Sequence, residues 1–303
     1  MPLTMYVDKR FRQSSLDIID AANIIINDYA AKGFILTLRQ LYYQFVARGW
    51  LTNTEQNYTR IGTIVSDARL AGLIDWAAIE DRTRRVNSTP HWSSPAEIVH
   101  AAAESFRLDK WASQPLRIEV WIEKDALLGV IEPACVELDV PYFACRGYSS
   151  QSAQWRAGER FNEYLENEQG VLIIHLGDHD PSGIDMTRDN QDRLDLFTYN
   201  YGIEVRRIAL NMDQIRAFNP PPNPAKLTDT RAGSYISRFG PSSWELDALD
   251  PTVIDQLIRS EIIKERDDAE WDKAVKRENK DRTLLNRCSI DWTKIEKTLT
   301  SKK

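Results

Sequence analysis

The stretch GVLIIHLGDHDPSG, residues 170–183, determines how the rest of this sequence is interpreted. Residues 171–174 are an uninterrupted run of Val, Leu and Ile, which predicts a buried strand. The run stops at Gly177, and Asp178 and Asp180 follow two positions apart. Because side chains alternate sides in extended backbone, both carboxylates face the same way if the extended conformation continues. The stretch therefore predicts a strand end with paired acids, which is a place to hold a divalent metal.

The segment around this strand alternates between strand and helix patterns. We expect strands at residues 117–123, 140–148, 171–177 and 203–210, with helical segments between them. This order is typical of a mostly parallel sheet with helices on its faces. Ligand sites in such sheets collect at the carboxyl ends of the strands, so the sequence predicts an α/β domain with its site at that edge.

The N-terminal part has a helical pattern instead. Apolar residues recur at helical spacing over residues 11–31, 37–50 and 55–71, and each run ends near a glycine. Three compact helices followed by extended residues are the outline of a helix-turn-helix or winged-helix module. Such modules bind DNA or mediate protein contacts, and the helical pattern does not choose between these two roles.

The Ser-Gln-Pro segment at residues 113–115 is the best candidate for a domain boundary. We therefore predict one domain over residues 1–112 and a second over residues 113–303, the latter with a C-terminal helical extension. That extension is densely charged over residues 264–282, which is typical of a solvated helix or a dimer contact.

The composition of the 303 residues is that of a soluble globular protein, with 42% hydrophobic and 28% charged residues. No apolar run is long enough to span a bilayer and the N-terminus has no signal-peptide core, so we expect a cytoplasmic protein without membrane contact. Three widely spaced cysteines argue against a disulfide framework and against a zinc site of paired cysteines. A net charge of −6 neither indicates nor excludes DNA binding.

Three carboxylates are candidate metal ligands. Glu123 ends the first expected strand, and Asp178 and Asp180 end the third, so neighbouring strands would bring them together. Hard oxygen ligands favour Mg²⁺ or Mn²⁺, which could stabilise a phosphodiester transition state. Each acid also has a structural explanation: Asp180 fits a helix N-cap before a proline, Glu123 the first turn of a helix, and Asp178 a turn. Together, at matching strand ends, they favour a metal site.

The positions of the histidines and the absence of nucleotide-binding motifs argue against some classes of site. His175 and His179 lie in no HExxH pattern and beside no cysteine pair, which argues against zinc. His179 lies between the two acids, where it could contact substrate or occupy a surface turn. The sequence has no GxxxxGK[ST] and no GxGxxG after a strand, so we expect no nucleotide hydrolysis by this chain.

Several motifs together resemble a Toprim domain, whose signature is a glutamate after one strand and DxD after a later one. They are WIEKDAL, CRGYSSQSAQWR and GDHDPSG. The Pro and Gly after DxD, the RGY-S segment and the downstream WELDALDP narrow the resemblance to the A subunit of topoisomerase VI, its meiotic double-strand-break relatives and short stand-alone mini-A proteins. In that family a winged-helix domain with the catalytic tyrosine precedes the Toprim domain, and TLRQLYYQFVARG lies in the corresponding place. The resemblance covers roughly residues 35–263.

The resemblance implies that Tyr43 is a nucleophile that attacks a DNA phosphate and forms a 5′-phosphotyrosyl link. A phenol has an ordinary pKa of about 10 and needs a base or a cation to activate it. Arg39 precedes Tyr43 by one helical turn, on the same face, and could steady the phosphate or the phenolate. Tyr42 and Tyr43 are adjacent, and because this helix also needs core residues, we expect one of the pair to serve in packing.

The resemblance further implies that Glu123 is a general acid/base or metal ligand, and that Asp178 and Asp180 hold Mg²⁺, with Mn²⁺ as a possible substitute. Arg146 and Lys124 are expected to contact DNA. In the family two chains pair, so a homodimer is expected, with the tyrosine of one chain meeting the metal of the other. A separate ATPase subunit is a further candidate partner, since no ATP-binding region is encoded here.

The expected function is therefore Mg²⁺-dependent, tyrosine-mediated cleavage and rejoining of DNA by a protein resembling the A subunit of a type IIB topoisomerase, associated with the nucleoid. Two alternatives stay open. One is a Toprim nuclease that uses water and leaves no covalent adduct. The other is a DNA-binding protein that keeps the fold without chemistry.

Overall fold

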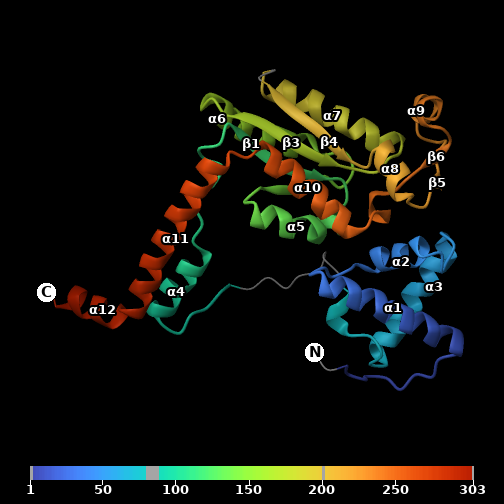
Figure 1. Ribbon diagram of the computed structural model, residues 1–303, viewed down its shortest axis with the longest axis horizontal. Coiled ribbons are helices and arrows are strands. Elements are labelled where there is room, and N and C mark those ends of the chain that lie inside the picture. Colours follow the sequence, from blue (N-terminus) through green and yellow to red (C-terminus); the bar gives the residue numbers. More distant parts are fainter. Residues whose placement is uncertain (1–2, 80–88, 200–201, 302–303) are drawn as a thin grey trace. The chain divides into compact units, whose positions relative to one another are not determined.

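The computed structural model describes residues 3–79, 89–199 and 202–301 (Figure 1). This part of the chain is an α/β structure, as the alternation of strand and helix patterns predicted. No helix within it is long and apolar enough to cross a membrane.

The contacts of the chain divide it into two compact units, each of which joins two separate stretches of sequence. The first unit comprises Met1–Arg84 and Ile118–Ile263, and the second comprises Arg85–Arg117 and Lys264–Lys303. The predicted domains, residues 1–112 and 113–303, are instead continuous stretches, and their boundary stays a prediction.

A four-stranded parallel sheet in the order β2-β1-β3-β4 organises the first unit. Its strands are β1 (Leu116–Ile122), β2 (Tyr142–Ala144), β3 (Gly170–Leu176) and β4 (Ile203–Ala209). The prediction of a mostly parallel sheet is confirmed. Because β1 and β3 are neighbours, the two strands expected to end in acidic residues lie next to each other.

Helices cover both faces of this sheet. Figure 1 shows α6 (Gln151–Glu166) and α7 (Pro181–Phe197) on one face, and α5 (Leu128–Glu137) and α10 (Pro251–Glu265) on the other. Gly158 lets α6 and α7 approach closely, because a Cβ at this position would lie 2.5 Å from the Cβ of Phe197. The apolar core of this face contains Trp121, Cys145, Ala157, Phe161, Val171, Ile173, Leu194 and Ile203.

The second strand is shorter than predicted. The sequence pattern extends it over residues 140–148, but β2 ends at Ala144. Arg146 and Gly147 adopt left-handed backbone, with φ values of 56° and 85°. Backbone of this kind cannot continue a strand, so the chain turns toward Ser150, whose side chain caps α6.

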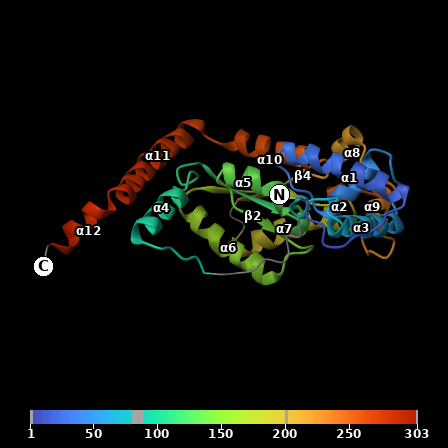
Figure 2. The ribbon, with the colours of Figure 1, turned by 90° about the horizontal axis from the view of Figure 1, so that it is seen from below.

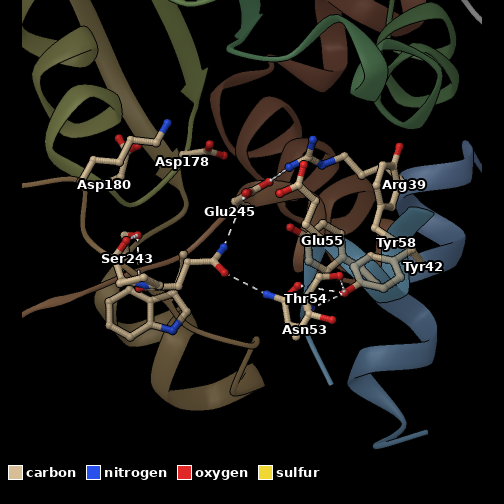
Figure 3. A pocket seen from close by; sticks show the side chains of 15 residues that line it. Arg39, Tyr42, Asn53, Thr54, Glu55, Tyr58, Asp178, Asp180, Ser243 and Glu245 are labelled. Carbon is tan, nitrogen blue, oxygen red and sulfur yellow. Dashed lines mark hydrogen bonds and ion pairs between the residues drawn. The ribbon is translucent and has the colours of Figure 1, made fainter. Parts of the chain in front are cut away.

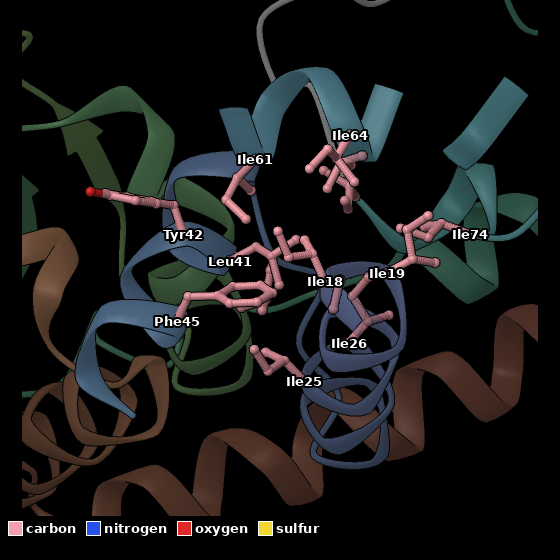
Figure 4. Close-up of a cluster of buried hydrophobic side chains, with 14 of the residues drawn as sticks. Ile18, Ile19, Ile25, Ile26, Leu41, Tyr42, Phe45, Ile61, Ile64 and Ile74 are labelled. Atoms are coloured by element: carbon pink, nitrogen blue, oxygen red, sulfur yellow. The ribbon is translucent and has the colours of Figure 1, made fainter. Parts of the chain in front are cut away.

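The three predicted N-terminal helices are present as α1 (Gln13–Ala31), α2 (Leu38–Ala47) and α3 (Glu55–Leu70). Thr37 and Gln40 form a capping box at the start of α2, with each side chain accepting a hydrogen bond from the other residue's backbone N–H. The helices share the apolar cluster of Figure 4, which includes Ile18, Ile25, Leu41, Phe45, Ile61 and Ile74. The extended segment predicted after them runs into residues 80–88, outside the described residues, so the winged-helix assignment stays a prediction.

A less regular segment follows the sheet and returns to its edge. It contains α8 (Met212–Phe218), β5 (Asn223–Pro224), α9 (Ala232–Phe239) and β6 (Ser242–Ser243), and β5 and β6 pair antiparallel. Three 3-10 helices complete the first unit: Trp76–Ala78, Asp125–Leu127 and Leu246–Ala248.

The second unit is helical. It contains α4 (Pro95–Ser105), α11 (Asp268–Ile290) and α12 (Trp292–Thr300), and α4 and α11 lie side by side in both views (Figures 1 and 2). Glu278 of α11 is buried, and its Oε2 accepts hydrogen bonds at 2.8 Å from a backbone N–H and from the Lys110 ammonium. The charged helix predicted here is confirmed, but one of its carboxylates is buried against the segment after α4.

Candidate active site

The ends of β1 and β3 bring Glu123 and Asp178 into contact. The backbone N–H of Glu123 donates to Leu176 O at 2.8 Å, and the backbone N–H of Asp178 donates to Glu123 Oε2 at 2.7 Å. Gly177 lies between them, where a Cβ would come within 3.0 Å of Glu123 Oε2. Any side chain here would crowd the Glu123 carboxylate, and the predicted meeting of these strand ends is confirmed.

Asp180 caps a helix and also faces a cavity. Its Oδ1 accepts a hydrogen bond at 2.6 Å from the backbone N–H of Gly183, and Pro181 follows as the first residue of α7. The structural explanation that the sequence offered for Asp180 is thus observed. Asp180 nevertheless lines the same cavity as Asp178, so the capping role does not remove it from the candidate site.

A second acidic segment, Trp244–Asp247, lies against the first. His179 and Trp244 exchange two backbone hydrogen bonds, at 2.8 and 3.0 Å, and the backbone N–H of Leu246 donates to Asp178 Oδ1 at 2.8 Å. This pairing brings Glu245 and Asp247 to the strand ends. Sequence reasoning used WELDALDP only for the resemblance and missed both acids, although their spacing of two residues repeats that of Asp178 and Asp180.

Lys124 lies at the centre of these carboxylates. Its Nζ is 2.9 Å from Asp178 Oδ2, 3.1 Å from Glu245 Oε2 and 3.4 Å from Asp247 Oδ1. Burial alone would lower the pKa of Lys124, but the surrounding carboxylates outweigh it and raise that pKa. The predicted DNA contact of Lys124 is untested, and in this structure its ammonium neutralises the acidic cluster.

The tyrosine helix α2 meets the same carboxylates through Arg39. Its Nη2 is 2.5 Å from Glu245 Oε2 and its Nε is 3.1 Å from Asp247 Oδ2, while its guanidinium carbon lies 5.9 Å from the centre of the Tyr43 ring. Burial, followed by the nearby Glu245 carboxylate, raises the pKa of Tyr43 to about 12, and Arg39 opposes the rise. The phenol is therefore fully protonated at neutral pH.

Tyr42 and Tyr43 have different surroundings. The Tyr42 hydroxyl donates toward Thr54 O at 3.0 Å and accepts the Thr54 N–H at 2.8 Å, and its ring stacks edge-on against Tyr58, with centroids 5.4 Å apart. Tyr42 thus fastens the turn between α2 and α3. Tyr43 instead lies near Arg39, which favours its ionisation, and near Glu245, which opposes it. These contacts favour Tyr43 over Tyr42 as the reactive residue and leave Tyr42 a structural role.

A cavity of about 440 Å³ joins the two groups of residues within the first unit. Figure 3 shows Arg39 and Tyr42 on one side of it, Asp178 and Asp180 on the other, and Glu245 between them. Tyr43 lines the same cavity. One chain therefore supplies both the tyrosine and the paired acids to one cavity, whereas the resemblance implied that they come from different chains.

Carboxylates gather where the ends of β1 and β3 meet the cavity. Burial, followed by the charge of Asp178, raises the pKa of Glu123 to about 7. Burial and the charge of Asp247 raise the pKa of Asp178, while the Lys124 ammonium opposes the rise. Carboxylate oxygens are the ligands that Mg²⁺ prefers. Among the described residues, however, no group of three or more His, Cys, Asp or Glu is gathered closely enough to hold a metal ion. The acids are therefore ligands of the type that Mg²⁺ prefers, but the cation that lies beside Asp178 in this structure is the Lys124 ammonium.

Arg207 of β4 is a positioning residue that sequence reasoning missed. Its guanidinium is buried behind the acidic turn and donates to the backbone oxygens of Gly177 at 2.9 Å, Asp178 at 2.7 Å and Gly183 at 2.9 Å. Burial lowers the pKa of Arg207 to about 10, while the neighbouring acids oppose the change. Its carbonyl contacts hold the backbone on both sides of Asp180, and no sequence motif marks an arginine in this role.

The two histidines are structural. His179 is buried and its Nδ1 lies 2.7 Å from the Tyr235 hydroxyl, so the expectation of an exposed turn was wrong, and a substrate contact stays untested. His175 is fully buried, and its Nδ1 lies 2.9 Å from Thr187 Oγ1. Burial lowers the pKa of His179 to about 4 and that of His175 to about 3, so both are neutral at physiological pH.

Arg146 is not brought to this cavity. Its exposed side chain pairs with Asp125 at 3.2 Å and lines a different hollow, of about 540 Å³, beside β2. The predicted contact of Arg146 with DNA is untested. If it occurs, it lies outside the cavity that holds Tyr43.

Comparison with known proteins adds no assignment: no family model matches the chain, nor does any characterised protein or solved structure with which it was compared.

Proposed function

We propose that this protein cleaves DNA by transesterification, with Tyr43 as the nucleophile and Mg²⁺ as the cofactor, and rejoins it by the reverse reaction. The observation that carries the proposal is the shared cavity, which Tyr43, Arg39, Asp178 and Asp180 all line. A nucleophile, a cation and paired acids are the groups that phosphodiester transfer requires. The resemblance to the topoisomerase VI A subunit points to the same chemistry.

In the proposed reaction the Tyr43 oxygen attacks a DNA phosphorus. A bond from that oxygen to phosphorus forms and the bond from phosphorus to the 3′ oxygen breaks. The proton that the phenol gives up to a base is balanced by one that the leaving 3′ oxygen takes up. The products are a 5′-phosphotyrosyl link and a free 3′ hydroxyl, and attack by that hydroxyl restores the DNA. Because the pKa of Tyr43 is about 12, its deprotonation needs help, and Arg39 is placed to stabilise the phenolate.

Glu123, Asp178 and Asp180 are the residues that would hold Mg²⁺. When bound, the ion would stabilise negative charge on the phosphate and on the leaving 3′ oxygen. Glu123 touches the turn through the Asp178 N–H, which leaves its other oxygen to accept or return a proton. Both halves of the site lie in one chain, so the proposed cleavage does not require the tyrosine of a second copy, although a homodimer would be needed to cut both strands at once.

A covalent-adduct assay tests the proposal. Protein is incubated with supercoiled plasmid and Mg²⁺, quenched with detergent, and analysed with and without protease digestion. We expect wild-type protein to leave protease-sensitive, protein-linked 5′ ends, and Tyr43→Phe to lose them by at least about a thousandfold, because the attacking oxygen is absent.

Tyr42→Phe is the matched control, since it removes the neighbouring hydroxyl and should retain adduct formation. Free ends that persist in Tyr43→Phe would contradict the tyrosine mechanism and favour the metal-dependent nuclease that uses water. A plasmid that stays intact while a gel shift shows binding would leave only a DNA-binding role.

A further inference from the structure

Two cations are paired with Glu245 of the cavity: Arg39, which also lines the cavity, and Lys124, which contacts Glu245 and Asp178 beside it. Arg39 comes from α2 and Lys124 from the end of β1, and both contact the same oxygen, Oε2 of Glu245, at 2.5 and 3.1 Å. Two positive groups from distant parts of the sequence thus converge on one carboxylate oxygen. The same arrangement would bind an oxygen of a phosphodiester, since both are anionic oxygen acceptors.

Glu245 and Asp247 contribute to this arrangement differently. The side chain of Asp247 is 2% exposed and contacts the same two cations from behind, whereas that of Glu245 is 25% exposed and lines the cavity. Displacing Asp247 would require moving the protein core. Glu245 can rotate toward solvent, so it is the partner that an incoming anion can replace.

The second carboxylate oxygen of Glu245, Oε1, makes weaker contacts than Oε2 does. Oε1 accepts a long contact of 3.5 Å from Asn223 Nδ2, and Asn223 in turn accepts from Asn53 Nδ2 at 2.9 Å. Glu245 also interacts with the Tyr43 hydroxyl. The strong contacts of Glu245 are therefore those to Arg39 and Lys124. If a phosphate takes over those two cations, the carboxylate keeps only its uncharged neighbours among these contacts, Asn223 and Tyr43.

We propose that Arg39 and Lys124 form one phosphate-binding site for the DNA backbone, and that Glu245 occupies it as a built-in anion which the substrate phosphate displaces. The inference rests on the proposed function for the identity of the anion as DNA. In this proposal Glu245 inhibits DNA binding by pairing with both cations. Asp247 keeps both cations in position after phosphate has replaced Glu245.

The test measures binding of a fluorescein-labelled 20-base-pair duplex by anisotropy, in EDTA so that no cleavage occurs, over a series of salt concentrations. Glu245→Gln keeps the shape of the side chain and removes its charge. We expect it to bind the duplex roughly threefold to tenfold more tightly than wild type at each salt concentration, because phosphate no longer has to displace a carboxylate from the two cations.

Glu55→Gln is the matched control. Glu55 lines the same cavity, but among the described residues neither Arg39 nor Lys124 pairs with it. A general effect of charge on DNA binding would be equal in the two variants, whereas displacement predicts the larger gain in Glu245→Gln. Adding Arg39→Gln to Glu245→Gln should cancel much of the gain, and thermal unfolding shows whether each variant is folded.

Equal affinities of the two variants, weaker binding by a folded Glu245→Gln, or no measurable binding by any of the proteins overturns the inference. Its failure is distinguishable from that of the proposed function, because the adduct assay is scored separately in Mg²⁺. Tighter binding by Glu245→Gln without any adduct would support the phosphate site and refute the tyrosine chemistry.

Discussion

Two acidic segments of this protein have the same spacing but different roles. In the first, Asp178 and Asp180 follow a parallel strand and both line the cavity. In the second, Glu245 lines the cavity, but Asp247 is buried behind it. The first segment therefore presents a pair of candidate metal ligands. The second presents one partly exposed acid and one buried acid, so the backbone around each pair decides where the same spacing places the carboxylates.

The most direct test of this comparison is to neutralise Asp178, the first acid of the first segment. Asp178→Asn retains an acceptor for the Leu246 N–H but loses the charge. If the proposed function holds, we expect DNA cleavage to fall by roughly a hundredfold or more, comparable to the effect of EDTA on wild type, because the proposed metal site loses a ligand. The measurement is the initial rate of plasmid cleavage, with folding verified by circular dichroism. Cleavage at the wild-type rate would remove Asp178 from the metal site.

The second acids of the two segments should differ in stability. Asp247→Asn removes a buried carboxylate that pairs with both Arg39 and Lys124, so we expect a loss of about 3 kcal/mol in the free energy of unfolding. Asp180→Asn is the control, because asparagine caps helices as well as aspartate, and it should change stability by less than about 0.5 kcal/mol. Urea denaturation gives both values. Equal losses would mean that Asp247 is no more fixed than Asp180.

The backbone of the first segment offers a smaller test. A Cβ at Gly183 would lie 2.2 Å from Asp178 O, so Gly183→Ala must shift the acidic turn and should cost about 2 kcal/mol. Gly233 is also helical and has open space around it. Gly233→Ala should therefore be neutral or stabilise the fold by up to about 1 kcal/mol. If thermal unfolding finds the two substitutions equivalent, the turn is not as tightly packed as these contacts indicate.

Local sequence patterns were sufficient for much of the fold and for part of the site. Runs of β-branched residues and helical spacing predicted the parallel sheet and the three N-terminal helices, because both patterns depend on which face of an element is buried. The meeting of Glu123 and Asp178 followed from the rule that sites collect at strand ends. The overlong second strand was the main error of the fold prediction, because no simple pattern revealed the left-handed backbone at Arg146.

The sequence by itself determined the types of group in the site: paired acids after a strand, a tyrosine on an amphipathic helix, and an arginine one turn before it. Only the tertiary structure decided which groups meet. Glu245, Asp247 and Arg207 reach the site through backbone pairing and carbonyl contacts between segments far apart in the chain. Such contacts depend on backbone groups, which every residue carries, so the identity of a side chain says little about where they form.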